Sequence, residues 1–317
     1  MKNEGPFILE WVAWQRLLGI DHIVVLSNDC DDGTDAILDQ LDRIGVLRHL
    51  PNPYEILPEG GDKPQTAGFK YGRLLREWRE ADYVLLIDVD EFPCLREGDA
   101  DLKALLARLD HPDVLTMTET VFGSDRIVGY RDVPLTGQFT QAAPLAPGKW
   151  RARRGVKSLS RNDPRLLIRN HRPRVPPKHA ASVRWLDGSG RDMPNDLRQG
   201  LQKGIDCRGT YDLVALHHYP LRSLESFMVK VARGQPMGET LDVEYFRKRN
   251  RGGETNAWLL PHQSRLEAEI KSLKRDPLLA QLHDAAVAAH RAKIMKLRKT
   301  DLFRDLMRIA GVEESDA

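Results

Sequence analysis

The chain has 317 residues, of which 41% are hydrophobic and 30% are charged. This balance is typical of a globular protein and excludes wholesale disorder, a collagen-like repeat and a disulfide-stabilised miniprotein. The formal net charge of +2 is too close to neutral to indicate nucleic-acid binding by the chain as a whole.

The longest apolar runs, at residues 23–26 and 84–87, are far shorter than a membrane span, and no basic-then-apolar signal segment opens the chain. The three cysteines have neither the spacing of a disulfide framework nor that of a metal site, which is typical of reduced thiols. They are Cys30, Cys94 and Cys207. We therefore expect a cytoplasmic protein.

The first part of the chain alternates between helix-like and strand-like patterns. A helix is predicted over residues 6–18, because Pro6 suits its first turn and three large apolar residues recur at helical spacing. These three are Trp11, Trp14 and Leu18. A short buried strand is predicted at residues 22–26.

A second helix is predicted to begin at residues 32–34, and a third to cover residues 71–78 with apolar residues at helical spacing. A buried strand is predicted at 83–87. Alternation of helix and buried strand is typical of a parallel sheet that is covered by helices on both faces. Ligands of such sheets bind beyond the carboxyl ends of the strands, so the residues after 26 and 87 are where a site is expected.

The middle of the chain, residues 118–210, is irregular and rich in Gly, Pro and Arg. Residues 151–184, hereafter the basic region, carry eleven Lys and Arg residues against a single acid, Asp163. This charge favours binding of a phosphate or an acidic glycan over an exposed arginine-rich loop, and Lys157 and His171 are the first members to test. Because tryptophans only flank the basic region, no nucleic-acid partner is expected.

The last part of the chain returns to regular patterns. A strand is predicted at residues 213–217, a helix at 223–233, and helical structure from about 261 to the end. Basic and apolar residues over 291–308 form an amphipathic helix, which is suited either to an anionic membrane surface or to packing on the rest of the protein. Peripheral contact with the inner face of a membrane therefore stays open.

Asp88 and Asp90 directly follow the predicted strand at 83–87. Two carboxylates two residues apart can present oxygens to one Mg²⁺ or Mn²⁺ ion, which completes its shell with waters and substrate phosphates. The alternative is that these acids solvate a loop or cap a helix. Their position after a buried strand favours the metal site.

A second polar cluster, residues 27–34, follows the strand at 22–26. The side chains of Asn28 and Asp29 are suited to accept hydrogen bonds from a nucleoside. Asp32 or Thr34 is suited to cap the helix that follows. The spacing leaves both roles open.

Two histidines and two basic residues form a third cluster. His217 and His218 end a predicted strand, and a neutral imidazole suits a divalent ion as an additional ligand. Lys230 and Arg233 lie three residues apart on the next predicted helix, where both could meet one diphosphate. The alternative is a packed histidine pair beside a solvated basic face.

Six segments, in this order, resemble bacterial glycosyltransferases of family 2, and more specifically the branch related to the family 92 enzymes. The resemblance covers about residues 1–235. The segments are the first fourteen residues, Leu18-Gly-Ile-Asp-His-Ile23, Ser27-Asn-Asp-Cys with Asp32-Gly-Thr34, Asp88-Val-Asp-Glu-Phe92, Phe122-Gly-Ser124, and His218-Tyr219 with Ser223, Phe227, Lys230 and Arg233-Gly234.

The resemblance implies an α/β GT-A fold: a Rossmann-like, mostly parallel central sheet with helices on both faces, here followed by a helical C-terminal tail. It implies metal ligands at Asp88, Asp90 and His218, with Mn²⁺ or Mg²⁺ as the ion. The side chains expected to bind a nucleotide-sugar are Asn3, Glu4, Asn28, Asp29, Asp88, Lys157, Lys230 and Arg233.

The same resemblance suggests a division of the chain. Residues 1–235 are expected to form the GT-A domain, with a nucleotide-sugar-binding half at 1–117 and an acceptor half at 118–235. A linker is expected at 236–260 and a helical extension at 261–317.

Two features depart from the family pattern. The family's first strand normally lies just before the Lys-Asn-Glu-Gly segment, which here follows Met1, so we expect that the native protein begins upstream. No residue stands out as the catalytic base, for which Glu119, Asp125 and Asp212 stay open.

The function that the resemblance implies is metal-dependent transfer of a sugar from a nucleoside-diphosphate sugar to a glycan or other hydroxyl acceptor, with inversion. One alternative is a degenerate module that binds nucleotide-sugars without catalysis. Another is a phosphohydrolase with an Asp-x-Asp motif, which is disfavoured because Glu91 follows the motif and because the motif does not follow the first strand.

Overall fold

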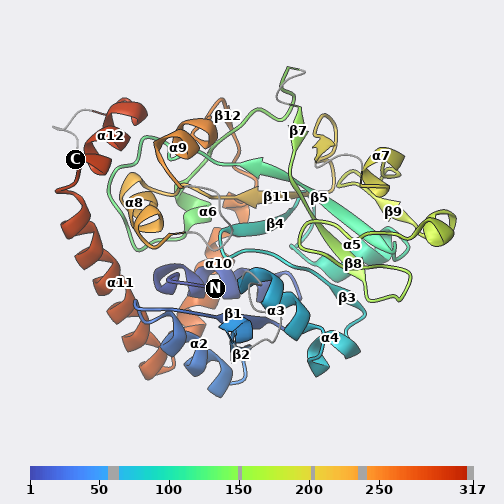
Figure 1. Ribbon diagram of the computed structural model, residues 1–317, viewed down its shortest axis with the longest axis horizontal. Helices are drawn as coiled ribbons and strands as arrows, with labels where there is room; N and C mark the ends of the chain where they lie inside the picture. The colour runs from blue at the N-terminus through green and yellow to red at the C-terminus, as the bar shows by residue number, and fades with distance from the viewer. Residues whose placement is uncertain (56–63, 149–151, 201–203, 235–240, 313–317) are drawn as a thin grey trace.

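The computed structural model describes residues 1–55, 64–148, 152–200, 204–234 and 241–312. Its architecture is mixed α/β, with one six-stranded sheet, a separate pair of parallel strands and helices around both (Figure 1). The expected boundary after residue 235 falls within 235–240, outside the described residues.

The main sheet has the order β3–β8–β5–β11–β4, and β9 also pairs with β5. β5 runs parallel to β11 and β9, whereas β8 is antiparallel to both β5 and β3, and β4 is antiparallel to β11. The expectation of a mostly parallel sheet is therefore wrong: the sheet is mixed. Its strands are β3 (Tyr83–Val84), β4 (Glu91–Leu95), β5 (Val114–Val121), β8 (Val156–Arg161), β9 (Trp185–Leu186) and β11 (Val214–His218).

The antiparallel pairs have local causes. The chain turns at Asp88–Asp90 between β3 and β4, so β4 enters the sheet as a partner of β11. β8 comes from the basic region and has five buried residues, Val156 to Ser160. Val156 and Leu159 are separated by polar residues that are themselves buried, and for this reason the apolar pattern did not reveal a central strand.

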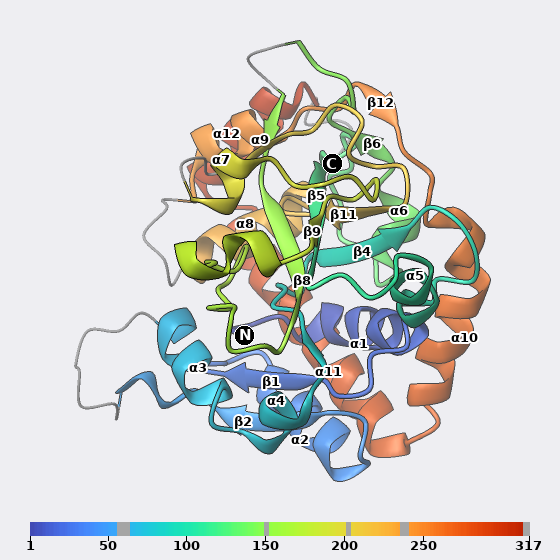
Figure 2. The ribbon, with the colours of Figure 1, turned by 90° about the vertical axis from the view of Figure 1, so that its right-hand side faces the viewer.

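A parallel β–α–β unit packs beside the main sheet. β1 (Val24–Ser27) and β2 (Arg48–Pro51) pair in parallel, and α2 (Thr34–Arg43) connects them. η1 (Gly5–Phe7) and α1 (Ile8–Leu17) confirm the helix predicted over residues 6–18. α1 lies between this unit and the main sheet (Figure 2) and is buried from Ile8 through Gln15.

The single helix predicted over residues 71–78 is wrong. α3 (Pro64–Gly72) covers only its first two residues, and α4 (Arg76–Glu80) starts after an extended residue, Leu75. Leu74, one of the apolar residues at helical spacing, is 69% exposed. The strand predicted at 83–87 is also shorter than expected, because regular pairing stops at Val84.

The helical C-terminus confirms the pattern from residue 261 onward, with α10 (Gln263–Leu273), α11 (Pro277–Leu297) and α12 (Asp301–Ala310). α10 packs on α1, and α11 packs on η1, α2 and α8 along one side of the molecule (Figure 1). α12 packs on α8 (Leu224–Ala232) and α9 (Val243–Arg249). The last helices therefore form part of the body that holds the N-terminal segment.

The remaining elements are short. They are η2 (Pro53–Glu55), α5 (Leu102–Arg108), α6 (Leu135–Gln138), β6 (Gln141–Ala142), β7 (Arg153–Arg154), η4 (Pro177–Ser182), α7 (Asn195–Arg198), β10 (Ile205–Asp206), β12 (Glu254–Thr255) and η5 (Leu260–His262). Among the described residues, no helix combines the length and the apolar character needed to cross a bilayer.

Gly5 fixes how closely η1 approaches α11. A Cβ atom built at this position would lie 2.7 Å from the Cβ of Ala286. We expect Gly5→Ala to lower the free energy of unfolding by about 1–3 kcal/mol, since neither backbone can easily move away. Thermal denaturation should show the loss, while Gly148→Ala, whose Cβ meets nothing within 4 Å, should change little.

The double variant Gly5→Ala/Ala286→Gly is the complementary test, because it removes the methyl group that the new side chain meets. Recovery of part of the lost stability would support a steric cause. A Gly5→Ala protein as stable as the wild type would contradict the close approach of η1 and α11.

Candidate functional site

The Asp-x-Asp motif lies in the turn between β3 and β4, at one end of the main sheet. Asp88 is about half exposed, with a side-chain exposure of 51%, whereas Asp90 is buried. β4 pairs with β11 in a register that places Glu91 opposite His218. An antiparallel pair therefore brings the motif to the end of β11, where the sequence analysis placed the histidine.

Asp90 is held by two partners that are far away in the sequence. Its Oδ2 accepts a hydrogen bond from Lys230 Nζ at 2.6 Å, and its Oδ1 lies 3.7 Å from His218 Nε2. Burial alone would raise the pKa of Asp90, but the charges of Lys230 and His218 hold this pKa well below its usual range. These two cations therefore favour the ionised form of Asp90.

His218 is oriented by a second acid. Its Nδ1 hydrogen-bonds to Glu119 on β5, which leaves Nε2 facing Asp90. Burial alone would lower the pKa of His218, but Asp90 and Glu119 raise it to about 10. Burial would likewise raise the pKa of Glu119, but His218 and Arg249 lower it to about 2. A carboxylate that fixes the far nitrogen of a histidine is a common arrangement behind metal ligands.

Lys157 on β8 is the member of the basic region that contacts the motif. Its side chain is 1% exposed, and Nζ lies 3.1 Å from Asp88 Oδ2, 3.2 Å from Glu91 Oε2 and 2.8 Å from Asn170 Oδ1. Burial would lower the pKa of Lys157, but the two carboxylates raise it. Burial also raises the pKa of Glu91 to about 7, against the effect of the Lys157 charge.

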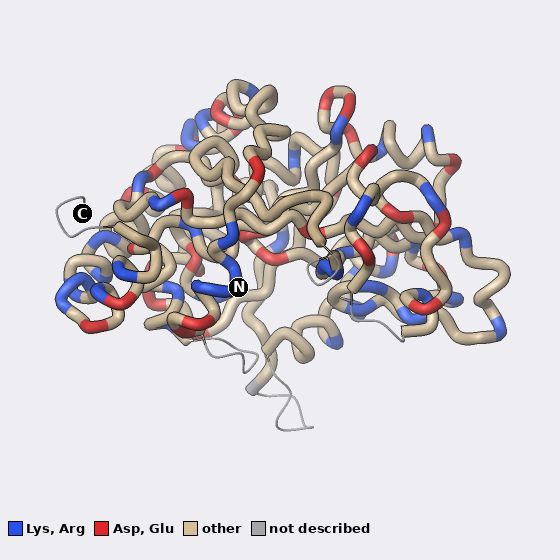
Figure 3. Tube along the Cα trace, turned by 90° about the horizontal axis from the view of Figure 1, so that it is seen from above, with Lys and Arg blue, Asp and Glu red and all other residues tan. Residues whose placement is uncertain are grey.

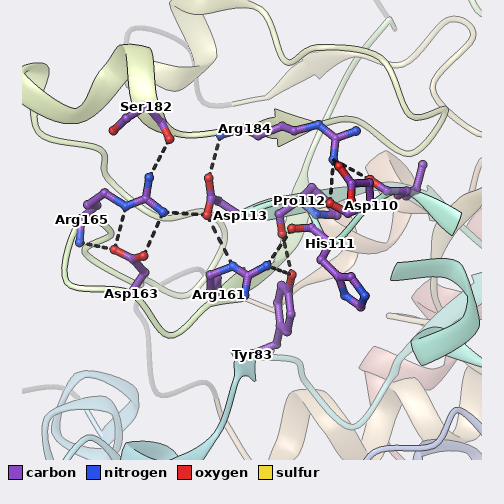
Figure 4. Close-up of polar contacts among 11 residues, drawn as sticks. Tyr83, Asp110, His111, Pro112, Asp113, Arg161, Asp163, Arg165, Ser182 and Arg184 are labelled. Carbon is purple, nitrogen blue, oxygen red and sulfur yellow. Dashed lines mark hydrogen bonds and ion pairs between the residues drawn. The ribbon is translucent and has the colours of Figure 1, made fainter. Parts of the chain in front are cut away.

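Three arginines of the basic region, Arg161, Arg165 and Arg184, contact Asp113 and not the Asp-x-Asp motif. Asp113 Oδ1 accepts a hydrogen bond from Arg165 at 2.8 Å, its Oδ2 accepts one from the backbone of Arg184 at 2.8 Å, and Arg161 lies 3.4 Å from Oδ1 (Figure 4). These cations are thus used to join the basic region to the start of β5. Arg151 lies outside the described residues.

Glu4 joins the N-terminal segment to the two ends of α8. Its carboxylate pairs with Arg222, just before α8, at 2.8 Å and with Arg233, at the end of α8, at 2.5 Å. Arg233 also donates to the backbone oxygens of Lys2 and Asn3 at 2.7 and 2.8 Å. Glu4 and Arg233, both expected to bind the donor, are therefore part of one buried ion-pair cluster near Lys230.

Arg222 is a residue of this cluster that the sequence analysis missed. Its backbone has a φ of 61°, an uncommon conformation for a residue other than glycine, and its guanidinium lies 3.7 Å from the ring centroid of Phe7. Among the described residues, its Nε and Nη2 have no hydrogen-bond partner although they are buried. No local pattern marks Arg222, since its role depends on Glu4, 218 residues away.

The polar cluster after β1 is more exposed. Asp29 Oδ2 accepts hydrogen bonds from Asn28 at 2.9 Å and from Tyr54 at 3.0 Å. The backbone of Asp29 also has a positive φ, 49°. Asn3 lies beside this cluster, since its Oδ1 accepts a hydrogen bond from the backbone of Asp31 at 2.8 Å.

Asp32 connects the start of α2 to η1. Its Oδ1 accepts a hydrogen bond from Thr34 N at 2.9 Å and its Oδ2 accepts one from Gly5 N at 3.1 Å. The N-cap position itself is Gly33, and no side chain caps it. The sequence left the cap to Asp32 or Thr34: Asp32 accepts the hydrogen bond from the first residue of α2, whereas the Thr34 hydroxyl accepts one from Glu4 N.

The three acids considered as catalytic base lie in different places. Glu119 is at the motif, bound to His218. Asp125 accepts hydrogen bonds from the backbones of Thr140 and Gln141 at 2.6 and 3.1 Å, and burial raises its pKa. Asp212 is exposed before β11, about 20 Å of extended chain from His218. Of the three, the fold brings Glu119 to the Asp-x-Asp motif.

The side chains at this end of the sheet match the ligands of a divalent ion only in part. Within the described residues, no group of three or more His, Cys, Asp or Glu side chains is placed to hold a metal. Asp90 Oδ1 and His218 Nε2 are 3.7 Å apart, less than the ~4.2 Å that two metal–ligand bonds of about 2.1 Å can span. Asp88, the third expected ligand, contacts Lys157 instead.

The comparisons with known proteins find partial similarity to plant proteins named glycosyltransferase family 92. The chain is 31% identical to one from Oryza sativa subsp. japonica over 94 residues, which is 29% of this chain and 15% of the relative. It is 32% identical to one from Arabidopsis thaliana over 92 residues (28% and 14%), and 27% identical to one from Ricinus communis over 144 residues (43% and 23%).

Each match spans less than a quarter of the relative's length. No family model matches the chain. The similarity supports a link to glycosyltransferases, and therefore to the transferase class, at low identity. It does not support the narrower placement among bacterial family 2 enzymes.

Proposed function

We propose that this chain is a glycosyltransferase with a GT-A-like fold that transfers a sugar, with inversion, from a nucleoside-diphosphate sugar to a hydroxyl of a glycan or other acceptor. One observation carries the proposal: Asp90, His218 and Lys230 meet at one end of the sheet. The partial similarity to glycosyltransferase family 92 proteins supports the same activity.

A divalent ion, Mn²⁺ or Mg²⁺, would be held by Asp90 and His218, with Asp88 beside them, and would have to displace the proton that the raised pKa of His218 keeps on the imidazole. When bound, it would supply Lewis-acid stabilisation of the departing diphosphate. Glu119 keeps the ring of His218 in place through Nδ1. Lys230 on α8 and Arg233 at its C-cap, three residues apart, would bring two positive charges to the leaving diphosphate.

The remaining donor contacts are assigned to the polar cluster after β1. Asn28 and Asp29 are exposed enough to accept hydrogen bonds from a nucleoside, and the bond between them fixes the direction in which the Asp29 carboxylate points. Glu4 and Asn3 hold the N-terminal segment beside this cluster. Inversion needs a base for the acceptor hydroxyl, and Glu119, Asp125 and Asp212 remain the candidates.

The proposal is tested by incubating the protein with a panel of nucleotide-sugars and Mn²⁺. Release of a nucleoside diphosphate, with the sugar transferred to an acceptor or to water, is the expected result. Release of inorganic phosphate would instead support the phosphohydrolase alternative. Stabilisation by a nucleotide-sugar in thermal denaturation without turnover would support the binding module.

A cytoplasmic protein with peripheral contact to an anionic membrane belongs to the same proposal. The apolar residues Phe303 and Leu306 of α12 are buried against α8 and α9, so a contact would depend on charge. Basic residues alternate with acidic ones in this part of the chain (Figure 3), and Arg304 and Arg308 pair with acids of α12 itself.

We expect weak co-sedimentation with phosphatidylserine vesicles at low salt, lost at higher salt because the charges are screened. Lys296→Gln/Lys299→Gln should weaken it further, since both side chains are exposed. Failure to bind these vesicles at low salt would remove the membrane contact from the proposal.

A further inference from the structure

A short hairpin of the basic region, residues 167–174, has a fixed conformation. Leu167 and Arg174 close it with two backbone hydrogen bonds, each of 2.9 Å. Ile168 and Pro173, one in each arm, are buried. The residues between them are therefore presented on a loop that the rest of the protein holds in place.

One lysine joins this hairpin to the Asp-x-Asp motif. Lys157 Nζ donates hydrogen bonds to Asn170 Oδ1, in the hairpin, at 2.8 Å and to Asp88 Oδ2 at 3.1 Å. About half of the Asp88 side chain is exposed, so the motif is accessible to solvent next to this contact. The hairpin therefore borders the accessible part of the motif.

The hairpin carries positive charge that no nearby acid neutralises. Residues 167–178 contain four Lys or Arg residues and no acid. The one acid of the basic region, Asp163, is paired with Arg165. Three guanidinium groups of the hairpin form no ion pair with any residue that the structure describes, namely those of Arg169, Arg172 and Arg174.

These three arginines are suited to bind an anionic group. Arg172 is partly buried, and burial lowers its pKa, an effect that the charge of Asp196 opposes only in part. Arg169 and Arg174 are exposed. A guanidinium presents N–H donors in a plane that matches the oxygens of a carboxylate or a phosphate. Such a group on a substrate would compensate the charge of the hairpin.

We propose that the hairpin binds an acidic acceptor, that is, a glycan or other sugar with a carboxylate or phosphate group near the hydroxyl that is glycosylated. The inference rests on the proposed function and adds the chemical class of the acceptor to it. The cations proposed for the leaving diphosphate reach the motif at Asp90, whereas the hairpin reaches it at Asp88. For this reason we assign the hairpin to the acceptor and not to the donor.

The first test measures sugar binding to the full chain by calorimetry at low salt. Hexagalacturonate probes the carboxylate, with its methyl ester as the neutral counterpart, and glucose 6-phosphate probes the phosphate, with glucose as its counterpart. We expect one of the two acidic sugars to bind at least about tenfold more tightly than its neutral counterpart, because hydrogen bonds between charged groups are stronger. The difference should shrink at higher salt, where the charges are screened.

Arg169→Gln/Arg174→Gln tests the hairpin itself. Both side chains are exposed, so the fold should tolerate the change. The variant should bind the acidic sugar at least about tenfold more weakly than the wild type does. Lys271→Gln/Arg275→Gln is the matched control, since it removes the same charge from exposed positions at the end of α10 and should not change this affinity. Uridine, guanosine and adenosine 5′-diphosphates are titrated into the same proteins with Mn²⁺, to separate the acceptor from the donor.

Equal affinity of the wild type for both acidic sugars and their neutral counterparts would overturn the inference. Unchanged affinity in the hairpin variant, or an equal loss in the control variant, would do the same. If the hairpin variant weakens binding of a nucleoside diphosphate and not of the acidic sugar, the hairpin belongs to the donor site and the acceptor assignment is wrong. The proposed function survives each of these results, and it fails separately if no nucleotide-sugar of the panel is cleaved.

Discussion

Asp90→Asn is expected to lower the rate of sugar transfer by about 100- to 1000-fold, the usual effect of removing one preorganised electrostatic group from an active site. The asparagine keeps the shape of the side chain and an acceptor for Lys230 at 2.6 Å. It removes the negative charge that faces His218 and that a divalent ion needs. The rate is measured with the donor found in the nucleotide-sugar panel.

The stability of this variant has to be measured beside its activity. Lys230 is buried, and loss of a charged partner from a buried pair costs up to about 3–5 kcal/mol. Thermal denaturation therefore identifies a temperature at which both the variant and the wild type are folded. The rates of the two proteins are compared at that temperature. Asp21→Asn, which weakens an exposed ion pair with Lys103, is the control. Full activity in folded Asp90→Asn would exclude Asp90 from the donor site.

Glu4→Gln is expected to have the largest effect on stability, a loss of about 3–5 kcal/mol in the free energy of unfolding. Glu4 is buried and is shared by Arg222 and Arg233, at 2.8 and 2.5 Å. Glutamine fills the same space but leaves both guanidinium groups without a negative partner. Urea unfolding monitored by circular dichroism measures the loss.

The effect of Glu4→Gln should depend on pH. Burial alone would raise the pKa of Glu4, but Arg222, Arg233 and Lys230 lower it below the usual value of 4.5. A lowered pKa in the folded state means that the carboxylate contributes stability above about pH 4.5 and loses it as the pH falls through the folded-state pKa. The difference between wild type and variant should therefore shrink in acid.

Glu80→Gln provides the comparison, because it makes the same chemical change in an exposed pair with Arg76. Exposed pairs contribute at most about 1 kcal/mol. Similar losses in the two variants would mean that the buried cluster around Glu4 is no more important than a surface ion pair.

Several helices could be predicted from the sequence, because apolar residues at helical spacing indicate which face of a segment is buried. The helix at residues 6–18, the helix at 223–233 and the helical C-terminus all carry large apolar residues at helical spacing, and the structure has them. The apolar pattern did not predict a strand where the buried residues are polar or where few residues are buried. β8 buries Lys157, Ser158 and Ser160. β2 has no buried residue at all, so no apolar run marks it.

Of the candidate site, too, only a part could be predicted from the sequence. Asp88, Asp90 and His218 follow or end predicted strands, so their chemistry and their nearness to a sheet end could be argued from the chain alone. Glu91 could have been noticed too, since it directly follows the motif. The role of Arg222 could not, because its partner Glu4 is 218 residues away.

Which side chains carry charge and which segments bury an apolar face follow from the order of the residues, because these are properties of neighbouring residues. The tertiary structure alone decided the direction in which the strands pair and which cation meets which acid. Strand direction depends on how the chain returns to the sheet, as at the turn before β4. An ion pair such as Lys230 with Asp90 forms when folding brings residues 140 positions apart into contact and excludes the water that would otherwise separate them.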